Sequence, residues 1–202
     1  ELGARGDGRI GRWELTGYHA RVNHELLSVE VAPVPNLFIA ENNASPTVHQ
    51  GIEAGLNSAL WQGGNGRLSL RQAYTFSDFR YRDDRRFGGS RLPGLPRHAY
   101  QAELRYDHGS GLYASINTEY ASRMFVDYAN TYRADSHLVF GSRAGFDAPS
   151  GRWQGWLELR NLGNVRYAAT VTPGYDDGGR DVARSTPGEG FGVYAGMRLR
   201  FD

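Results

Sequence analysis

Arginines concentrate in one stretch of the sequence, RYRDDRRFGGSRLPGLPRH, which covers residues 80–98. Arg85, Arg86 and Arg91 could bind an anionic ferric chelate or another polycarboxylate, because a guanidinium group contacts carboxylates through two parallel hydrogen bonds. The alternative is a solvated surface loop in which the aspartates at 83–84 neutralise the arginines. The stretch therefore predicts either a site for an anionic ligand or a polar connection.

Two later stretches add candidate ligand contacts. Tyr128 and Tyr132 could stack on a flat chelate, although tyrosines of this kind also sit at membrane interfaces. Arg180 lies in a long polar stretch, 162–190, and is a further candidate contact. The aspartates at 176–177 in the same stretch lack the spacing and the closing glutamate of an EF-hand calcium loop. We therefore predict ligand contacts here but no metal site.

Several classes of function are disfavoured by composition. The chain of 202 residues has no cysteine, which excludes disulfides, thiolate metal sites and cysteine nucleophiles. Its formal net charge is +1, so electrostatics give no reason to expect a nucleic-acid partner. A hydrolase would need a nucleophile and an orienting group near a histidine; His98, which follows the aspartates at 83–84, is the best available candidate and has neither. We predict no enzyme activity and no cofactor.

The elements that would position these residues are β-strands, because apolar and polar residues alternate with a period of two along most of the chain. About eight such strands can be counted, of roughly 10–14 residues each, which is longer than the usual mean. No amphipathic helix is evident. The alternating segments lie at 48–60, 67–76, 99–106, 112–120, 137–146, 152–162 and 192–202, with a less regular one starting at 11. The predicted fold is an all-β, antiparallel up-and-down meander.

The connections alternate between short and long. QGGNG, DHGSG and DAPSG carry the turn-forming residues of tight hairpins. Long polar connections, at 33–46, 81–98, 124–133 and 162–190, separate the other strand pairs. In a meander, alternate connections lie at the same end of the sheet. One end should therefore carry tight turns and the other long loops, which is typical of an outer-membrane barrel.

A soluble β-sandwich also alternates, but the unequal loops and the long strands favour the barrel. In a barrel the apolar face of each strand contacts lipid, and the charged face lines the lumen, where we expect cross-strand ion pairs. Aromatic residues near strand ends would form the interfacial girdles. These residues are Trp13, Trp61, Tyr81, Tyr106, Tyr120, Trp153, Phe191 and Phe201.

Four segments together resemble the C-terminal part of TonB-dependent outer-membrane receptors: NNASPTVHQGIEAGL, SRLPGLPRHAY, LELRNLGNVRYAA and the terminal RLRF. The first departs from the family pattern at Ser45 and Pro46, and the third at its second asparagine. The resemblance implies a barrel of about 22 strands, filled by an N-terminal plug and energised through TonB, in the outer membrane of a Gram-negative bacterium. Residues 1–202 would supply about the last eight strands, with ELGAR as the end of the preceding strand.

The resemblance also implies a function. The receptor would bind and import a scarce solute, by default a ferric siderophore, and its partners would be this small molecule, the lipid bilayer and TonB, reached through the plug region. The tail STPGEGFGVYAGMRLRFD is similar to that of receptors for pyrroloquinoline quinone, which makes this compound or another chelate the alternative ligand. Two further alternatives stay open, a free-standing eight-stranded barrel and an outer-membrane hydrolase.

Overall fold

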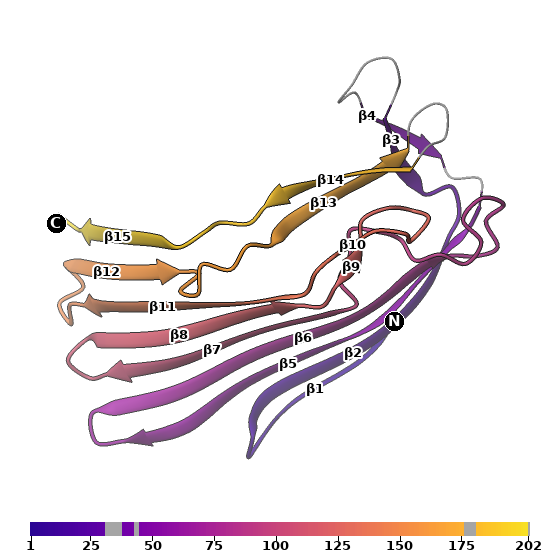
Figure 1. The fold of residues 1–202 in the computed structure, drawn as a ribbon. Coiled ribbons are helices and arrows are strands. Elements are labelled where there is room, and N and C mark those ends of the chain that lie inside the picture. The colour runs from indigo at the N-terminus through magenta and orange to yellow at the C-terminus, as the bar shows by residue number, and fades with distance from the viewer. Residues whose placement is uncertain (31–37, 43–44, 176–180, 202) are drawn as a thin grey trace.

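The computed structural model describes residues 1–30, 38–42, 45–175 and 181–201. Nine strands form one antiparallel sheet in the order β1-β2-β5-β6-β7-β8-β11-β12-β15, with β1 and β15 at its edges (Figure 1). These strands are β1 Leu2–Gly8, β2 Gly11–Val22, β5 Thr47–Gly63, β6 Gly66–Tyr81, β7 His98–His108, β8 Leu112–Ala121, β11 His137–Asp147, β12 Trp153–Arg160 and β15 Gly192–Leu199. Residues 2–5 of the ELGAR segment, which was expected to end a preceding strand, lie in β1, and β1 makes the ninth strand of the sheet. No helix in the described ranges is long and apolar enough to cross a bilayer.

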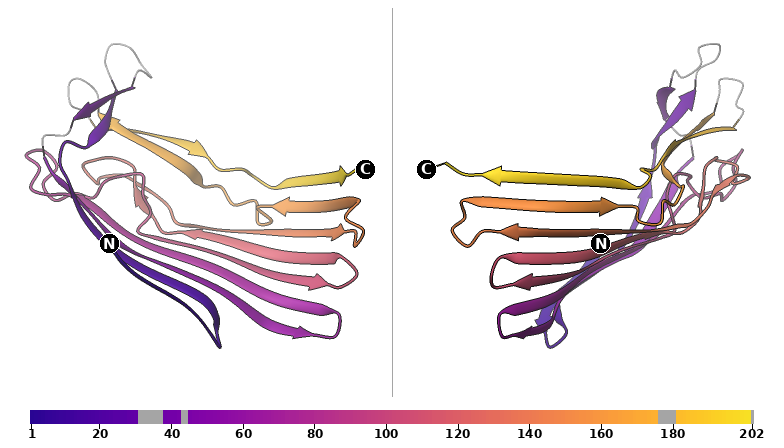
Figure 2. Two further views of the ribbon diagram at one scale, coloured as in Figure 1. Left: turned by 180° about the vertical axis from the view of Figure 1, so that it is seen from behind. Right: turned by 60° about the vertical axis from the view of Figure 1, so that its left-hand side comes forward.

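The two ends of the sheet differ as predicted. At one end, tight turns join β5 to β6, β7 to β8 and β11 to β12, and each needs a glycine with positive φ: 55° at Gly64, 98° at Gly111 and 69° at Gly151. At the other end, the long connections extend beyond the sheet (Figure 2). They contain three two-stranded ribbons: β3 Leu26–Glu30 with β4 Phe38–Asn42, β9 Met124–Phe125 with β10 Arg133–Ala134, and β13 Ala168–Tyr175 with β14 Asp181–Pro187.

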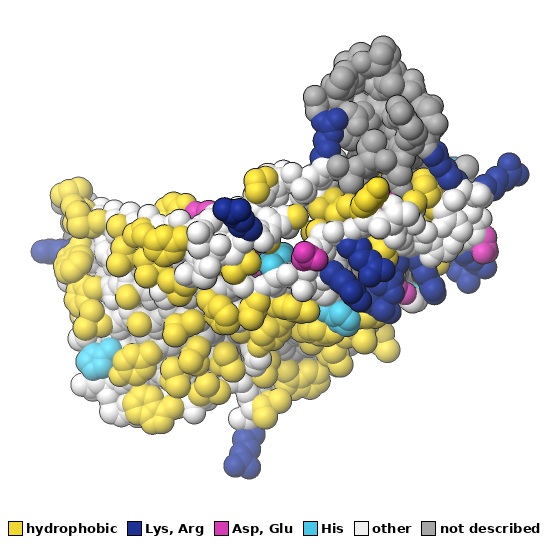
Figure 3. Space-filling model, viewed as in Figure 1, with side chains coloured by type: hydrophobic (Ala, Val, Ile, Leu, Met, Phe, Trp, Pro, Cys, Tyr) yellow, Lys and Arg dark blue, Asp and Glu magenta, His cyan; other side chains and the backbone are white. Residues whose placement is uncertain are grey.

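The register gives the sheet one apolar and one polar face. Leu70, Leu104 and Ile116 lie side by side on three neighbouring strands, and Ile116 is 58% exposed. The next row, shifted by one residue, contains Arg71 and Glu103 and faces the other way. Figure 3 shows hydrophobic side chains spread over the strands on the visible face. Such a continuous exposed apolar surface is what a lipid-facing wall requires. We call it the outer face, and the opposite one the inner face.

Glycines on the inner face lie beneath large side chains of the neighbouring strand. A Cβ atom added at any of three of them would overlap an aromatic ring paired with it in the register. The pairs are Gly51 with Tyr18, Gly145 with Tyr113, and Gly196 with Trp156. A ring laid across a glycine covers backbone that would otherwise be bare and fixes the strand register. The space next to each of these glycines is therefore filled by an aromatic ring of the same sheet.

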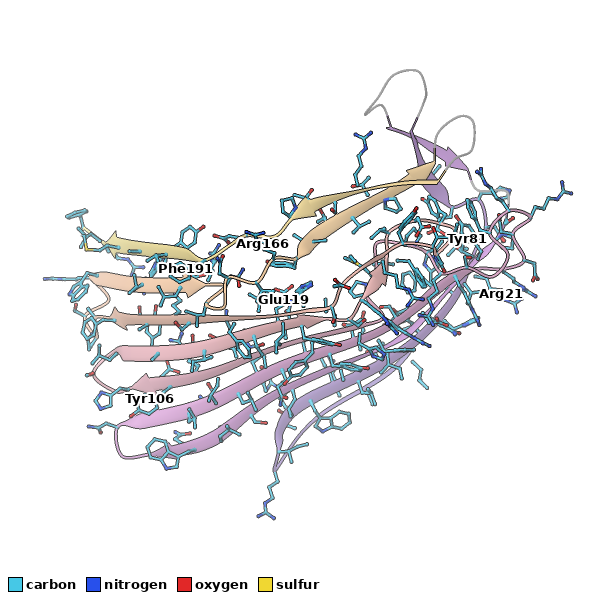
Figure 4. The ribbon with its side chains drawn as sticks, viewed as in Figure 1. Arg21, Tyr81, Tyr106, Glu119, Arg166 and Phe191 are labelled. Atoms are coloured by element: carbon cyan, nitrogen blue, oxygen red, sulfur yellow. The ribbon has the colours of Figure 1, made fainter. Side chains whose placement is uncertain are left out.

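The most buried side chains lie at the loop end. Tyr81 at the end of β6 is 2% exposed and packs against Tyr128, with Phe87 and Leu92 around them (Figure 4). We expected Tyr81 in an interfacial girdle; this expectation was wrong, because the two long connections fold over its ring. Trp61, Tyr106, Tyr120 and Trp153 are exposed on the outer face near strand ends, and for them the girdle stays a prediction.

Candidate functional site

The long connections at the loop end of the sheet fold into a defined structure, and one of them joins β6 to β7. This connection folds back along the end of β6, since the amide of Leu92 donates to the carbonyl of Phe79 at 2.8 Å. Its tip is closed by Asp84, whose carboxylate accepts hydrogen bonds from the backbone amides of Arg86 and Phe87, both at 2.7 Å. Burial acts to raise the pKa of Asp84, but these amides, the Ser45 side chain and the charge of Arg86 outweigh it and hold this pKa below its ordinary value.

The connection between β8 and β11 is organised by one carboxylate. Asp127 is 2% exposed and accepts hydrogen bonds from the amides of Thr131 and Tyr132, at 2.9 and 2.8 Å, and from the Thr131 hydroxyl at 2.5 Å. The resulting turn leaves the ring of Tyr132 71% exposed. Tyr128, in the same turn, points the other way and is only 3% exposed.

One asparagine joins the two connections. Asn130 has a positive φ of 61°, and its side chain both accepts from the amide of Arg91 at 2.8 Å and donates to the carbonyl of Arg91 at 2.9 Å. This reciprocal pair works like one rung of a β-ladder. It fixes the two connections relative to each other, so the loop end of the sheet, which we call the mouth, has a defined shape.

Below these connections, the inner face holds a polar hollow of about 540 Å³. Its charged lining comes from five neighbouring strands of the sheet, β6, β7, β8, β11 and β12, and from the connection before β15; Figure 4 labels Glu119 of β8. Arg143 and Glu158 face each other in the register at 3.9 Å, as expected for cross-strand pairs. Arg160 instead contacts Glu158 on its own strand at 2.5 Å, and Glu189 at 3.6 Å. The hollow therefore carries both signs of charge, and its ion pairs gather on the β11–β12 side.

The structure separates the residues proposed as ligand contacts. Arg85 and Arg86 are exposed at the tip of the β6–β7 connection, with the guanidinium of Arg86 5.2 Å from the centre of the Phe87 ring. Arg91 lies near Asp78, at 3.6 Å. Tyr132 is exposed and Tyr128 buried, as described above. Arg180 lies outside the described residues.

Sequence reasoning did not single out the residues that join the connections to the sheet. Asn161, 3% exposed and with a φ of 47°, donates to the carbonyls of Val165 and Glu189, both at 2.8 Å. It thereby ties the end of β12 to the segment that leads into β15. A positive φ at a non-glycine residue is uncommon, and asparagine is among the residues that adopt it most readily. The asparagines of RNLGN were therefore the available signal for this joint.

Comparisons with known proteins agree with this architecture. The family model described as TonB dependent receptor-like, beta-barrel, matches residues 1–165. The ferric yersiniabactin uptake receptor FyuA from Yersinia pestis superposes with a TM-score of 0.75 at 17% identity, over 100% of this chain and 29% of that one. The ferric citrate transporter FecA in its unliganded form gives 0.74 at 20% identity, over 98% and 30%. The siderophore receptor PiuA from Acinetobacter baumannii gives 0.67 at 18% identity, over 96% and 27%.

This chain thus spans about three tenths of the length of these solved receptors. Its match to the family model covers most of its own residues, and its fold is that of the wall in the solved structures. The chain therefore belongs to the TonB-dependent receptor-like β-barrel family, whose members lie in the outer membrane of Gram-negative bacteria and transport solutes rather than catalyse reactions.

Proposed function

We propose that this chain is part of the wall and mouth of a receptor that binds a ferric siderophore or a similar chelate and imports it with energy delivered through TonB. In the full-length protein, a plug segment beyond these residues would fill the lumen and contact TonB. The chain itself contributes binding and a passage, with no bond made or broken by its residues.

The observation that carries the proposal is the two-sided sheet. One face is continuously apolar and exposed, and the other is charged and holds the polar hollow beneath a fixed mouth. A wall of this kind separates lipid from a wet path, which a transporter of polar solutes requires. The names of the three solved relatives, two ferric-chelate transporters and a siderophore receptor, favour an iron chelate over other solutes.

Within the mouth, we propose that Arg85, Arg86 and Tyr132 meet the ligand. All three are exposed at the loop end, and they combine guanidinium groups for carboxylates or catecholates with a ring that can stack on a flat chelate. Tyr128 supports them from the buried cluster. Arg180 remains a proposed contact, on the sequence argument alone.

The test is ligand binding by the purified full-length receptor. Quenching of intrinsic fluorescence would be titrated with ferric citrate, catecholate and hydroxamate siderophores, and pyrroloquinoline quinone. We expect one iron chelate to bind, and the Arg85→Ala/Arg86→Ala double variant to weaken it about tenfold, as loss of charged hydrogen bonds predicts. Arg152→Ala, an exposed arginine in the tight turn between β11 and β12, is the matched control and should bind normally.

Uptake of radioactive iron by cells deprived of iron completes the test. Deletion of tonB should abolish uptake while leaving binding to the purified receptor unchanged. Selective binding of pyrroloquinoline quinone with no iron chelate bound would replace the proposed ligand by its alternative. Binding of none of these compounds would refute the chelate proposal.

A further inference from the structure

The β6–β7 connection, residues 82–97, occupies a central place among the long connections of the mouth. In the order of the sheet it lies between the β2–β5 connection on one side and the β8–β11 and β12–β15 connections on the other. Figure 1 shows all four gathered at one end of the sheet. In the described residues, the β6–β7 connection contacts each of the other three.

The first contact joins it to the β2–β5 connection. The amide of Arg82 donates to the carbonyl of Pro46 at 2.8 Å. The hydroxyl of Ser45 donates to the carboxylate of Asp84, which closes the tip of the β6–β7 connection. Ser45 and Pro46 come directly before β5, which begins at Thr47. The tip is therefore tied to the point at which β5 enters the sheet.

The second contact joins it to the β8–β11 connection at three places. Asn130 forms the reciprocal pair of hydrogen bonds with the backbone of Arg91. The amide of Gly94 donates to the carbonyl of Phe125 at 2.8 Å. The ring of Tyr128 packs in the buried cluster at the start of the β6–β7 connection. Backbone and side-chain contacts thus hold these two connections together.

The third contact joins it to β13 in the β12–β15 connection. Pro93 followed by Gly94, with a φ of 82°, has the residues and the backbone conformation of a type II turn. A Cβ atom added at Gly94 would lie 3.3 Å from the carbonyl oxygen of Val171 and 3.6 Å from the Cδ atom of Pro173. The backbone of the turn therefore lies directly against β13.

The contact made by Asn130 matters most for the proposed ligand site, because the exposed arginines and Tyr132 lie on different connections. The hydrogen bonds that Asp84 accepts from backbone amides shape the arginine turn, and those that Asp127 accepts shape the turn of Tyr132. Each of these sets lies within one connection. Asn130 bonds across from one connection to the other and so sets the separation between the two groups of ligand contacts.

We propose that Asn130 is a positioning residue, which holds the arginines of the β6–β7 connection and Tyr132 at the separation that the solute requires before it binds. This inference rests on the proposed function, since it takes Arg85, Arg86 and Tyr132 as ligand contacts. A site that is already ordered pays less conformational entropy on binding. When only a fraction of the molecules has the competent arrangement, the apparent affinity falls by that fraction. Asn130 thus acts on affinity without touching the solute.

Distance measurement by pulsed electron paramagnetic resonance on the full-length receptor without ligand tests the positioning. Spin labels at Gly89→Cys and Tyr132→Cys report the separation, since both positions are exposed and residues 1–202 contain no other cysteine. The wild-type background should give one narrow distance distribution. Asn130→Gly keeps the positive φ without strain but removes the side chain. It should lower the population at the native separation about fivefold, as loss of two hydrogen bonds of modest strength predicts.

Binding is then measured on unlabelled receptors with ferric citrate and the ferric catecholate and hydroxamate siderophores. The dissociation constant of the chelate that binds should rise in Asn130→Gly by the factor found for the population, about fivefold. Hydrogen exchange at the amides of Arg86 and Thr131 should stay slow, which would show that each turn remains folded. Asn65→Gly, the same substitution in a tight turn at the opposite end, is the matched control and should change neither distance nor affinity.

Three results would each overturn the inference. They are an unchanged distance distribution in Asn130→Gly, a broadened distribution with unchanged affinity, and loss of amide protection in both turns, which would make Asn130 a residue of local folding only. Failure of the wild-type receptor to bind any of the chelates would refute the proposed function instead. The distance distributions, recorded without ligand, would still decide whether Asn130 sets the separation of the two connections.

Discussion

Replacing Asp127 by alanine should release the turn that presents Tyr132 at the mouth. In the native turn, the carboxylate accepts from the amides of Thr131 and Tyr132 and from the Thr131 hydroxyl, all within 2.9 Å, and it is almost completely buried. Alanine supplies no acceptor. Both amides would then have to open toward water, because no other acceptor in the described residues replaces the carboxylate.

The size of the effect follows from the number of bonds lost. A hydrogen bond to a charged group contributes about 1.5–3 kcal/mol, so loss of the two amide bonds at the lower value costs about 3 kcal/mol. The turn should then open about a hundred times more often, since each 1.4 kcal/mol corresponds to a factor of ten. The barrel strands are held together by their own backbone hydrogen bonds, so the destabilisation should stay within the turn.

Amide hydrogen exchange in the full-length receptor measures this opening. We expect protection of Thr131 and Tyr132 to fall about a hundredfold in Asp127→Ala, while amides in the middle of β8 and β11 keep their protection. Asp135→Ala is the matched control, since Asp135 is exposed in the same connection and no hydrogen bond or ion pair of its side chain is found in the described residues. Unchanged exchange at both amides in Asp127→Ala would show that the carboxylate does not hold the turn.

Three further predictions concern the wall and the β6–β7 connection. Gly51→Ala should destabilise the sheet by about 1–3 kcal/mol, because a Cβ atom at this position would overlap a backbone oxygen of β6 and the ring of Tyr18. Gly17→Ala is the control, since there is space around Gly17, and it should fold normally in a heat-modifiability assay. Ile116→Arg on the outer face should cost about 2–4 kcal/mol in folding into lipid vesicles, and Ala73→Arg in the inner hollow should be tolerated. The pKa of Asp84 is lower in the folded connection than in the unfolded chain, so its carboxylate stabilises the turn at pH values above the unfolded pKa. Pepsin cleavage of the connection should therefore increase as the pH falls below about 4, and Asp84→Asn should remove this dependence.

The sheet could be predicted from the sequence because every strand of the wall must alternate apolar residues toward lipid with polar residues toward the lumen. A one-residue shift would turn Ile116 into the lumen and Asn117 into lipid, so the alternation itself encodes the register. The tight turns were predictable for a similar local reason, since positive φ at Gly64 or Gly111 restricts which residues can stand there.

The ribbons in the long connections were not predictable in the same way. β13 and β14 contain Pro173 and Pro187, residues that usually argue against a strand. Outside the bilayer, a two-stranded ribbon needs no apolar face toward lipid, and therefore no regular alternation marks it. Its pairing depends on backbone hydrogen bonds, which leave no trace in the pattern of side chains.

The sequence indicated which residue types would form the candidate site, but not how these residues are arranged. Tyr128 and Tyr132 look equivalent in the sequence, yet one is buried and the other exposed. What separates them is the contact of Tyr128 with Tyr81, at the end of β6, and with Phe87, in the connection that follows β6. No periodicity within one segment carries such information, because the contact is made between two irregular segments whose relative position the whole sheet determines.

The motif RNLGN shows why the family could be identified before the ligand. Asn161 has a positive φ and holds two carbonyls from segments on either side of a long connection. Asn164, also with a positive φ, accepts from the amide of Phe191 just before β15. Any wall that must return its last strand to the sheet after a long excursion needs a joint of this kind, whichever solute it carries. The proposed ligand contacts Arg85 and Tyr132 meet no such requirement of the backbone. The residues that reveal the family are therefore those that join the strands to their connections, whereas the residues proposed to contact the solute lie on the connections themselves.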